Sequence, residues 1–440
     1  MKVAVIFVTD LTHSAPRISN FISHLKNSDD FEVILLGPSY LDILGDDDLP
    51  LDFSLNLTQV LFPRLKISKF LLSLTSRFNN KNKKDSFNRE FSDLKSTSFI
   101  DFYISFRKKI ILLYLSFMFP DQYGYYIVKY YKEFKKLNIS KYENVILVSS
   151  SPYVSSHVAC SLIKRFNNDS NIHWIADYRD LWSQNHNYPF SKLRNKLDSF
   201  LEKKILLKSD LVITVSSSWR DKLEKFISKK TILVPNGYSL PSNLSCNFSN
   251  LKKDSNKFYM LYVGSIYFGK QDVEFFINSI CSLNRSILEK FELHFCGKFS
   301  SQLQRLVDLK NLDFCIKQIG VYSRDASISM QSEYDYLLYF DWVDDSGVLP
   351  LKFYEYIFAN KPIIAVGHNS ESNSAIILKE LKRGYYLDSS INISSFISNN
   401  DYFKFNKELS FSPIENNKYS YEYRSKEFHE VLIKFLKNEL

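Results

Sequence analysis

The chain has 440 residues, too many for one ordinary hydrophobic core, so its length predicts two domains. Hydrophobic residues make up 45% and charged residues 24%, a balance that excludes an intrinsically disordered chain. The formal net charge is +9, but there is no recognised nucleic-acid-binding motif and no long basic tail. We therefore expect no nucleic-acid partner.

The cysteines and apolar runs indicate where the protein resides. Its five cysteines lack the close spacing of a zinc site and are odd in number, which favours a reducing compartment and no metal. The opening apolar run ends at Asp10 and is typical of a buried strand rather than a signal peptide. The longest apolar run, residues 110–119, is about half the ~20 residues that a membrane-spanning helix needs. We expect a cytoplasmic protein.

Apolar runs alternate with helical patterns through the first half of the chain. The apolar runs predict strands at 2–8, 31–37, 144–150, 171–177, 210–216 and 231–235. Helical spacing predicts helices at 17–26, 124–137, 154–166, 191–207 and 217–228. Unbroken apolar strands separated by helices predict a parallel sheet covered on both faces, here in an N-terminal domain over residues 1–240.

Residues 40–120 interrupt this alternation and are predicted to be an insertion, mostly helical and basic. Basic residues mix with aromatic and aliphatic ones at 62–84 and 106–120. Such a mixture favours contact with an anionic membrane surface, where apolar side chains enter the interface and Lys and Arg bind headgroups. The alternative is a solvated basic insertion that packs on its own domain.

The second half repeats the alternation after a polar, turn-rich linker at 236–257. Strands are predicted at 258–264, 291–297, 334–340 and 361–367, with a less distinct one near 315–321. These elements predict a second α/β domain over 255–420. A helix over 421–440 follows and could cross back to the first domain.

The segment 346–367 has the composition of an anion site at a helix N-terminus. Pro350 suits the first helical position, and Gly347 allows close approach to the free backbone N–H groups near Val348 and Leu349. Lys352 follows in the first turn, where a second positive charge makes sense if an anion is to bind.

A carboxylate on the same helix completes this pattern. Glu355 can accept two hydrogen bonds from a vicinal diol such as a ribose. The alternative is an i,i+3 Lys352–Glu355 surface pair worth a few tenths of a kcal/mol.

Two candidate groups of the first half follow strands. Asp177 ends a strand and Asp180 follows within one turn, so both carboxylates can face one site with Arg179 between them. One carboxylate could orient or deprotonate a substrate hydroxyl, and Arg179 could hold a phosphate or the partner carboxylate. The alternative is a structural Asp–Arg–Asp network. His157, at a predicted helix start, could be a general base, bind phosphate or be a buried donor.

The segment 346–367 resembles the donor-binding motif of family 4-like glycosyltransferases, in the pattern G-x-P-x-K-x-x-E-Y. The matching residues are Gly347, Pro350, Lys352, Glu355 and Tyr356. Three stretches of the first half, 119–131, 149–159 and 174–182, resemble a subgroup that acts in bacterial surface-polysaccharide assembly, with the pattern P-D, S-S-P-x-x-S-S-H and D-x-R-D-x-W.

Further positions match this family less fully. A strand ending at Gly264 leads to Lys270, where relatives place an Arg–Lys pair on the donor diphosphate; on its own, Lys270 would be a solvent-exposed lysine. Asn236 and Gly237 resemble a hinge-side P-N-G segment that could equally be a tight turn. Arg17 follows the first strand, where relatives contact donor or acceptor, although their glycine-rich loop is absent here.

The resemblance implies a GT-B fold, in which two Rossmann-like doubly wound parallel-sheet domains face a central cleft. It implies a retaining glycosyltransferase that needs neither metal nor cofactor and takes a nucleotide-diphosphate sugar. The acceptor would be a lipid-linked or growing saccharide of capsule, O-antigen or lipopolysaccharide, at the inner face of the cell membrane. Glu355 would hold the ribose, and Lys270 and Lys352 would neutralise the diphosphate.

Two departures from the family pattern keep other functions open. Gly347 stands where many relatives have a Glu, and the arginine expected near Lys270 is missing. These departures support a non-catalytic partner that binds sugar nucleotide or glycan. A sugar-nucleotide 2-epimerase of the same fold is a further alternative, which the D-x-R-D-x-W match disfavours.

Overall fold

The structure is a computed structural model that describes residues 2–11, 16–39, 58–63, 118–167, 171–185, 188–239, 253–343, 347, 349–398 and 417–440. The chain divides into two compact units. The first unit comprises Met1–Ile213 and Glu224–Ile232, and the second comprises Thr214–Leu223 and Leu233–Leu440. Most of the predicted insertion 40–120, including 62–84 beyond Pro63 and 106–117, lies outside the described residues.

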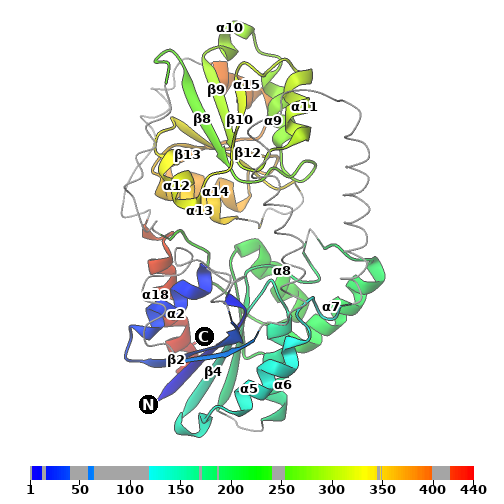
Figure 1. The fold of residues 1–440 in the computed structure, drawn as a ribbon, viewed down its shortest axis with the longest axis vertical. Coiled ribbons are helices and arrows are strands. Elements are labelled where there is room, and N and C mark those ends of the chain that lie inside the picture. Colours follow the sequence, from blue (N-terminus) through cyan, green and yellow to red (C-terminus); the bar gives the residue numbers. More distant parts are fainter. Residues whose placement is uncertain are drawn as a thin grey trace. The chain divides into compact units, whose positions relative to one another are not determined.

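The first unit is built on a seven-stranded sheet in the order β3-β2-β1-β4-β5-β6-β7 (Figure 1). Its strands are β1 (Val3–Val8), β2 (Phe31–Pro38), β3 (Thr58–Phe62), β4 (Asn144–Ser150), β5 (Ile172–Tyr178), β6 (Leu211–Thr214) and β7 (Thr231–Leu233). β1 pairs in parallel with both β2 and β4, so the first strand of the chain lies inside the sheet. Each predicted strand of this half is present, and β3 is one that the sequence did not reveal.

Helices connect these parallel strands. They are α2 (Arg17–Lys26), α5 (Tyr126–Lys135), α6 (Ser155–Phe166), α7 (Lys192–Leu206) and α8 (Ser217–Ile227), with a short 3₁₀ turn at Ile139–Lys141. α5 and α6 pack side by side, and α6 also contacts β4, β5 and α7 (Figure 1). All five predicted helices are present, within two residues of the expected ends.

The second unit contains a six-stranded sheet in the order β10-β9-β8-β11-β12-β13. Its strands are β8 (Phe258–Val263), β9 (Phe291–Cys296), β10 (Ile316–Gly320), β11 (Tyr336–Phe340), β12 (Ile363–Val366) and β13 (Gly384–Leu387). All five pairs of neighbouring strands are parallel, with β8 between β9 and β11. The less distinct strand near 315–321 is confirmed as β10, whereas β13 was not predicted.

The helices of the second unit are short, apart from the last one, and several begin at a serine cap. They are α9 (Val273–Ile280), α10 (Arg285–Leu288), α11 (Ser301–Leu309), α12 (Arg324–Gln331), α13 (Leu351–Phe358), α14 (Asn373–Leu381), α15 (Ser390–Ser398) and α18 (Tyr421–Leu436). The hydroxyls of Ser300, Ser323, Ser372 and Ser420 accept a hydrogen bond from a backbone N–H of the first turn. Such caps satisfy a donor that the helix itself cannot.

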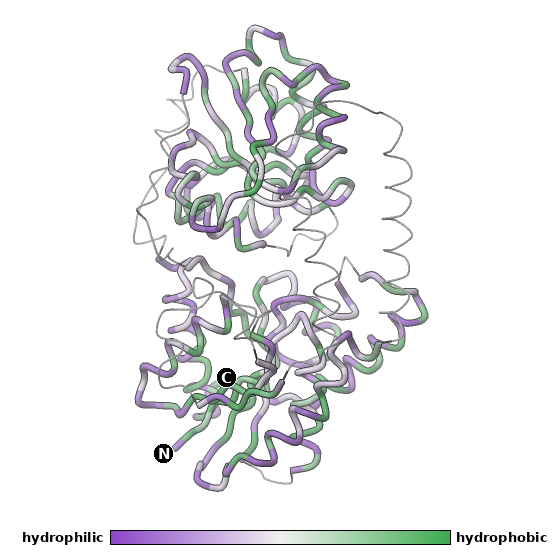
Figure 2. Tube along the Cα trace, in the orientation of Figure 1, coloured by the Kyte–Doolittle hydropathy of each residue, from purple (hydrophilic) through white to green (hydrophobic). Residues whose placement is uncertain are grey.

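The central strands of both sheets are buried on both faces, as their continuous apolar runs predicted. β1 and β11 are fully buried along their length, and stretches of hydrophobic colour run through the interior of both units in Figure 2. The core of the second unit gathers aromatic and aliphatic side chains from its strands and from α9, α11 and α15. The predicted α/β class with two doubly wound parallel sheets is therefore confirmed.

Two features are absent from the described residues, a membrane-spanning helix and a metal-binding cluster. None of the helices in the described ranges combines the length and apolar character that crossing a bilayer requires. Within the same ranges, no group of three or more His, Cys, Asp or Glu is placed to hold a metal ion.

Candidate functional site

Lys352 of the second unit is a partly buried cation at the start of a helix. It lies in the first turn of α13, and its Nζ donates a hydrogen bond to the Tyr262 hydroxyl, 2.6 Å away. The same Nζ lies 3.8 Å from the centre of the Tyr262 ring. Lys352 forms no ion pair with any described carboxylate. A cation at the positive end of a helix, with a ring and a hydroxyl as its partners, is a site that favours an anion.

Burial changes the protonation of this lysine. Removal from water disfavours the charged ammonium and lowers the pKa of Lys352 to about 7. The glycine at the end of β8 contributes to this environment, because Gly264 adopts a φ of +109° and a Cβ there would lie 3.6 Å from the Lys352 side chain. An arriving phosphate would supply a negative charge and favour the ammonium form.

Glu355 is buried one turn after Lys352 and is held by an arginine from another helix. Arg324 Nε, at the start of α12, lies 3.0 Å from Glu355 Oε1. Among the described residues, none donates a hydrogen bond to the other carboxylate oxygen, Oε2. The i,i+3 surface pair between Lys352 and Glu355 is not formed, since each has a different partner. Glu355 therefore presents an oriented carboxylate with one oxygen available for a hydroxyl donor.

The start of α13 differs in detail from the expected anion loop. Pro350 is the N-cap residue, one position before the predicted place, with an extended backbone. Leu349 is partly buried. Gly347 is buried, and a Cβ on it would lie 2.3 Å from Ser218 Oγ and 2.5 Å from a ring carbon of Trp219. The close approach at Gly347 is thus made by these two side chains. Val348 lies outside the described residues.

A cavity of about 380 Å³ in the second unit begins beside Leu349. Its lining combines the aromatic rings of Tyr354, Tyr419 and Tyr423 with polar groups that include Asn373 and Arg424. This volume lies within the range of small-molecule sites.

Lys270 is exposed in the loop after β8, which agrees with the alternative that it is a solvent-exposed lysine. Its backbone carbonyl accepts a hydrogen bond from Val343 N, 3.0 Å away, and Gln271 forms an isolated antiparallel bridge with Trp342. These contacts tie the loop after β8 to the loop after β11. In open parallel sheets, ligands bind outside this carboxyl edge of the strands.

The candidate group of the first unit is organised around a buried ion pair. Arg17 Nη2 lies 3.0 Å from Asp177 Oδ1, and both side chains are 0% exposed. Ser150 Oγ donates to Asp177 Oδ2 at 2.9 Å, so both carboxylate oxygens are engaged. The structure therefore brings Arg17 and Asp177 together across 160 residues of sequence. This geometry supports the structural alternative for Asp177.

Arg179 and Asp180 are partly buried and are held by one serine of the loop after β4. Arg179 Nε donates to the Ser151 carbonyl at 2.7 Å, and the Asp180 backbone N–H donates to Ser151 Oγ at 2.9 Å. These bonds fix the loop after β5 against the loop after β4. The proposed roles of Arg179 in phosphate binding and of Asp180 in activating an acceptor stay predictions.

His157 is fully buried in α6. Its Nδ1 lies 2.7 Å from Ser149 Oγ, and its ring stacks on Tyr178 with centroids 4.8 Å apart. Burial lowers the pKa of His157 to about 3, so the imidazole is neutral at physiological pH. A neutral, stacked ring matches the buried-donor alternative better than a cationic phosphate ligand.

Gly237 allows two backbone segments of the second unit to meet. Tyr238 N donates to Tyr419 O at 2.8 Å, and Tyr421 N donates to Tyr238 O at 2.9 Å. A Cβ on Gly237 would lie 2.8 Å from backbone atoms of residues 419–421. The φ of Gly237 is not in the left-handed region, so its backbone conformation does not require glycine. Glycine is needed because any Cβ would collide with the neighbouring backbone. Asn236 is partly buried beside it.

Two residues that shape the site of the second unit were not predicted from the sequence. Tyr262 supports Lys352, and Arg324 orients Glu355. Tyr262 stands two residues before Gly264 at a strand end, which is a weak signal. Arg324 follows the capping Ser323 and carries no motif of its own.

Comparisons with known proteins bear on the fold. No family model matches the chain, and no curated protein matches it. Sucrose-phosphate synthase from Thermosynechococcus elongatus superimposes with a TM-score of 0.58 at 12% identity, covering 100% of both chains. HepE from Anabaena, solved in complex with UDP, gives 0.59 at 12% identity over 99% of this chain and 100% of that one. The fold is GT-B.

A third solved structure is that of an enzyme with a different activity. UDP-GlcNAc 2-epimerase from Methanocaldococcus jannaschii gives a TM-score of 0.51 at 13% identity, covering 98% of this chain and 99% of that one. At such low identities these likenesses concern the fold. The choice between transfer and epimerisation must come from the site.

Proposed function

We propose that the protein is a glycosyltransferase that takes a nucleotide-diphosphate sugar in its second unit and transfers the sugar to a saccharide acceptor. The observation that carries this proposal is Lys352, a partly buried cation at the start of α13 with no described carboxylate as a partner. A diphosphate is the ligand class whose charge fits that position.

Each polar group near α13 has a role in this proposal. Lys352 binds the diphosphate and Lys270 adds a second, exposed positive charge. Glu355, held by Arg324, accepts hydrogen bonds from the ribose hydroxyls through Oε2. As the bond to the sugar breaks, negative charge grows on the leaving diphosphate, and prearranged cations and helix-start amides stabilise it. In this scheme the transfer needs no metal and no cofactor.

The finer assignment comes from the sequence resemblance. We propose a retaining, family 4-like enzyme whose acceptor is a lipid-linked or growing saccharide in bacterial surface-polysaccharide synthesis. The motifs at 119–131, 149–159 and 174–182 support it, and the last two run from the ends of β4 and β5 into the segments that follow. The enzyme would act at the cytoplasmic face of the cell membrane.

A 2-epimerase is the second candidate, because a solved epimerase shares the fold. A non-catalytic binding partner is the third, and the packing of Trp219 against Gly347 favours it, since that space is where many relatives carry a Glu. All three candidates bind a sugar nucleotide, and they differ in what becomes of it.

The test is to incubate the purified chain with a panel of nucleotide sugars, with and without saccharide acceptors, and to follow nucleotide release and the sugar product. A transferase releases nucleoside diphosphate in an acceptor-dependent reaction. A new sugar epimer without acceptor would favour the epimerase, and binding without any product would favour the partner.

A matched pair of variants connects the reaction to the site. We expect Glu355→Ala to lower nucleotide affinity at least about tenfold, since a buried carboxylate loses two hydrogen bonds to its ligand. Glu289→Ala is the control, because Glu289 also pairs with an arginine, at 3.1 Å, but lies before β9 at the opposite edge of the sheet. Equal affinity in both variants would remove Glu355 from the site.

A further inference from the structure

Helix α7 of the first unit has its acidic and apolar side chains on unexpected sides. Its two acids, Asp198 and Glu202, are fully buried. Its exposed apolar side chains are Leu193, Leu197, Phe200 and, at the C-cap, Leu207, which are 80%, 50%, 56% and 53% exposed. A surface helix normally turns its apolar side chains to the core and its charges to water.

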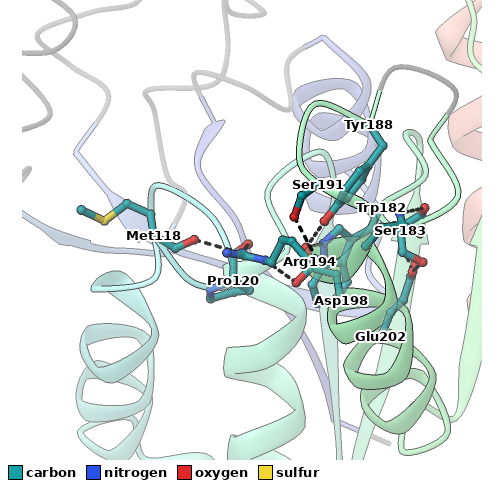
Figure 3. A network of polar contacts seen from close by, with 10 residues as sticks. Met118, Pro120, Trp182, Ser183, Tyr188, Ser191, Arg194, Asp198 and Glu202 are labelled. Atoms are coloured by element: carbon teal, nitrogen blue, oxygen red, sulfur yellow. Dashed lines mark hydrogen bonds and ion pairs between the residues drawn. The ribbon is translucent and has the colours of Figure 1, made fainter. Parts of the chain in front are cut away.

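The buried face of α7 explains the position of the acids (Figure 3). Asp198 accepts hydrogen bonds from Arg194 Nε at 2.8 Å and from the Tyr188 hydroxyl at 2.7 Å. Glu202 accepts one from the backbone N–H of Ser183 at 3.0 Å. These bonds attach the helix to the loop after β5. They leave the opposite face of α7 without any acidic residue.

The exposed face combines apolar side chains with lysines. Positions 193, 197, 200, 204 and 207 fall on one side of a helix of 3.6 residues per turn. All five lysines of this segment are exposed, namely Lys192, Lys196, Lys203, Lys204 and Lys208. Lys204 Nζ lies 4.2 Å from the centre of the Phe200 ring, so a charge stands within the apolar stripe.

The first turn of α7 is joined to the end of the apolar run 110–119. Arg194 Nη2 donates to the carbonyls of Met118 and Pro120, at 3.0 and 3.1 Å (Figure 3). Phe119, between them, is 46% exposed and lies 5.1 Å from the Arg194 guanidinium. An exposed aromatic side chain therefore extends the apolar stripe beyond the helix.

We propose that this face of α7, with Phe119, docks on an anionic lipid bilayer. Leu193, Leu197 and Phe200 would enter the interface while the lysines bind headgroup phosphates. Charge argues against two other occupants. The first is the segment 64–117 of the same chain, which carries twelve basic and four acidic side chains and would be repelled by the lysines. The second is another copy of the protein, which would present the same five lysines. A nucleic acid would match the lysines but leave the leucines in water.

The test compares sedimentation of the full chain with phosphatidylglycerol-containing vesicles and with pure phosphatidylcholine vesicles. We expect binding to the anionic vesicles only. The triple variant Leu193→Ser, Leu197→Ser, Phe200→Ser should bind at least about tenfold more weakly, because interfacial affinity scales with buried apolar area. The control is Val128→Ser, Phe166→Ser, which alters side chains 57% and 58% exposed on α5 and α6 and should bind like the unchanged protein.

A second variant tests the charges. Lys196→Glu with Lys203→Glu should also weaken binding to anionic vesicles at least about tenfold, since each lysine contributes to attraction by the surface potential. Equal vesicle binding by the triple variant and its control would overturn the proposal.

Measurements without vesicles identify the other occupants. A triple variant that lowers the unfolding temperature, or that converts a dimer to a monomer, would assign the face to the chain itself or to a second copy. Binding of single-stranded DNA that needs the lysines but not the leucines would assign it to nucleic acid. Each of these results would overturn the proposal. Nucleotide affinity should be unchanged in the triple variant, so failure here is separable from failure of the proposed function.

Discussion

The two units carry polar groups at the same kind of place, the carboxyl edge of a parallel sheet, but satisfy them differently. In the first unit, Asp177 is completely buried and both its oxygens are bound by Arg17 and Ser150. In the second unit, Lys352 is partly buried, is supported by Tyr262, and has no described carboxylate beside it. In the first unit the charges are paired within the chain, whereas Lys352 has no counter-charge among the described residues.

This difference separates stability from binding. A buried charge that is paired and hydrogen-bonded holds loops together, and removing its partner destabilises the fold. A desolvated charge without a partner is unfavourable until a ligand supplies the opposite charge. We therefore expect substitutions in the first group to act mainly on stability and those in the second mainly on ligand affinity.

The largest effect is expected from Asp177→Asn. This change leaves the Arg17 guanidinium buried without its carboxylate, which should lower the free energy of unfolding by about 3–5 kcal/mol. Urea unfolding measures it. Asp180→Asn, in the same loop but partly exposed, is the control and should cost less than about 1 kcal/mol. Loss of transfer activity in Asp177→Asn without loss of stability would instead make Asp177 catalytic.

A smaller effect sharpens the comparison within the first unit, where the Glu202 carboxyl is fully buried. Burial raises the pKa of Glu202 to about 7. In the unfolded chain this carboxyl ionises near pH 4.5, whereas in the fold it keeps its proton up to about pH 7. The free energy of unfolding should therefore fall by roughly 3 kcal/mol between these pH values and stay low above pH 7.

The measurement is the unfolding free energy across this pH range. Glu202→Gln should remove that pH-dependent loss and stabilise the protein at pH 8. The exposed Glu143→Gln should keep the slope of the unchanged protein. A slope that is the same in all three proteins would show that Glu202 is ionised in the fold.

Most of the fold was predictable because long apolar runs such as β1 and β4 can only be buried strands of a parallel sheet. The strands that were missed have weak patterns. β3 is largely half-exposed and lies in a basic region, and β13 is a four-residue edge strand with three partly buried residues. A strand that is buried on both faces has a continuous apolar run in its sequence, and edge strands lack such a run.

The site was only partly predictable, because its motif fixes positions along one helix and not their partners. Lys352 and Glu355 were found, but Arg324 reaches Glu355 from 31 residues away and Arg17 reaches Asp177 from 160. The close approach at Gly237 likewise depends on residues 419–421. Such pairings are set by the tertiary fold, and the local spacing of residues in the sequence does not predict them.

The central claim is that Lys352 binds the diphosphate of a nucleotide ligand. Calorimetric titration of UDP at several pH values tests this claim most directly. Because the pKa of Lys352 is about 7, affinity should fall as the pH rises above 7. Lys352→Met should weaken binding about 10- to 100-fold at pH 7, abolish that pH dependence and leave stability unreduced. Lys290→Met, exposed before β9, should match the unchanged protein. UDP affinity that is equal in all three proteins and independent of pH would contradict the account.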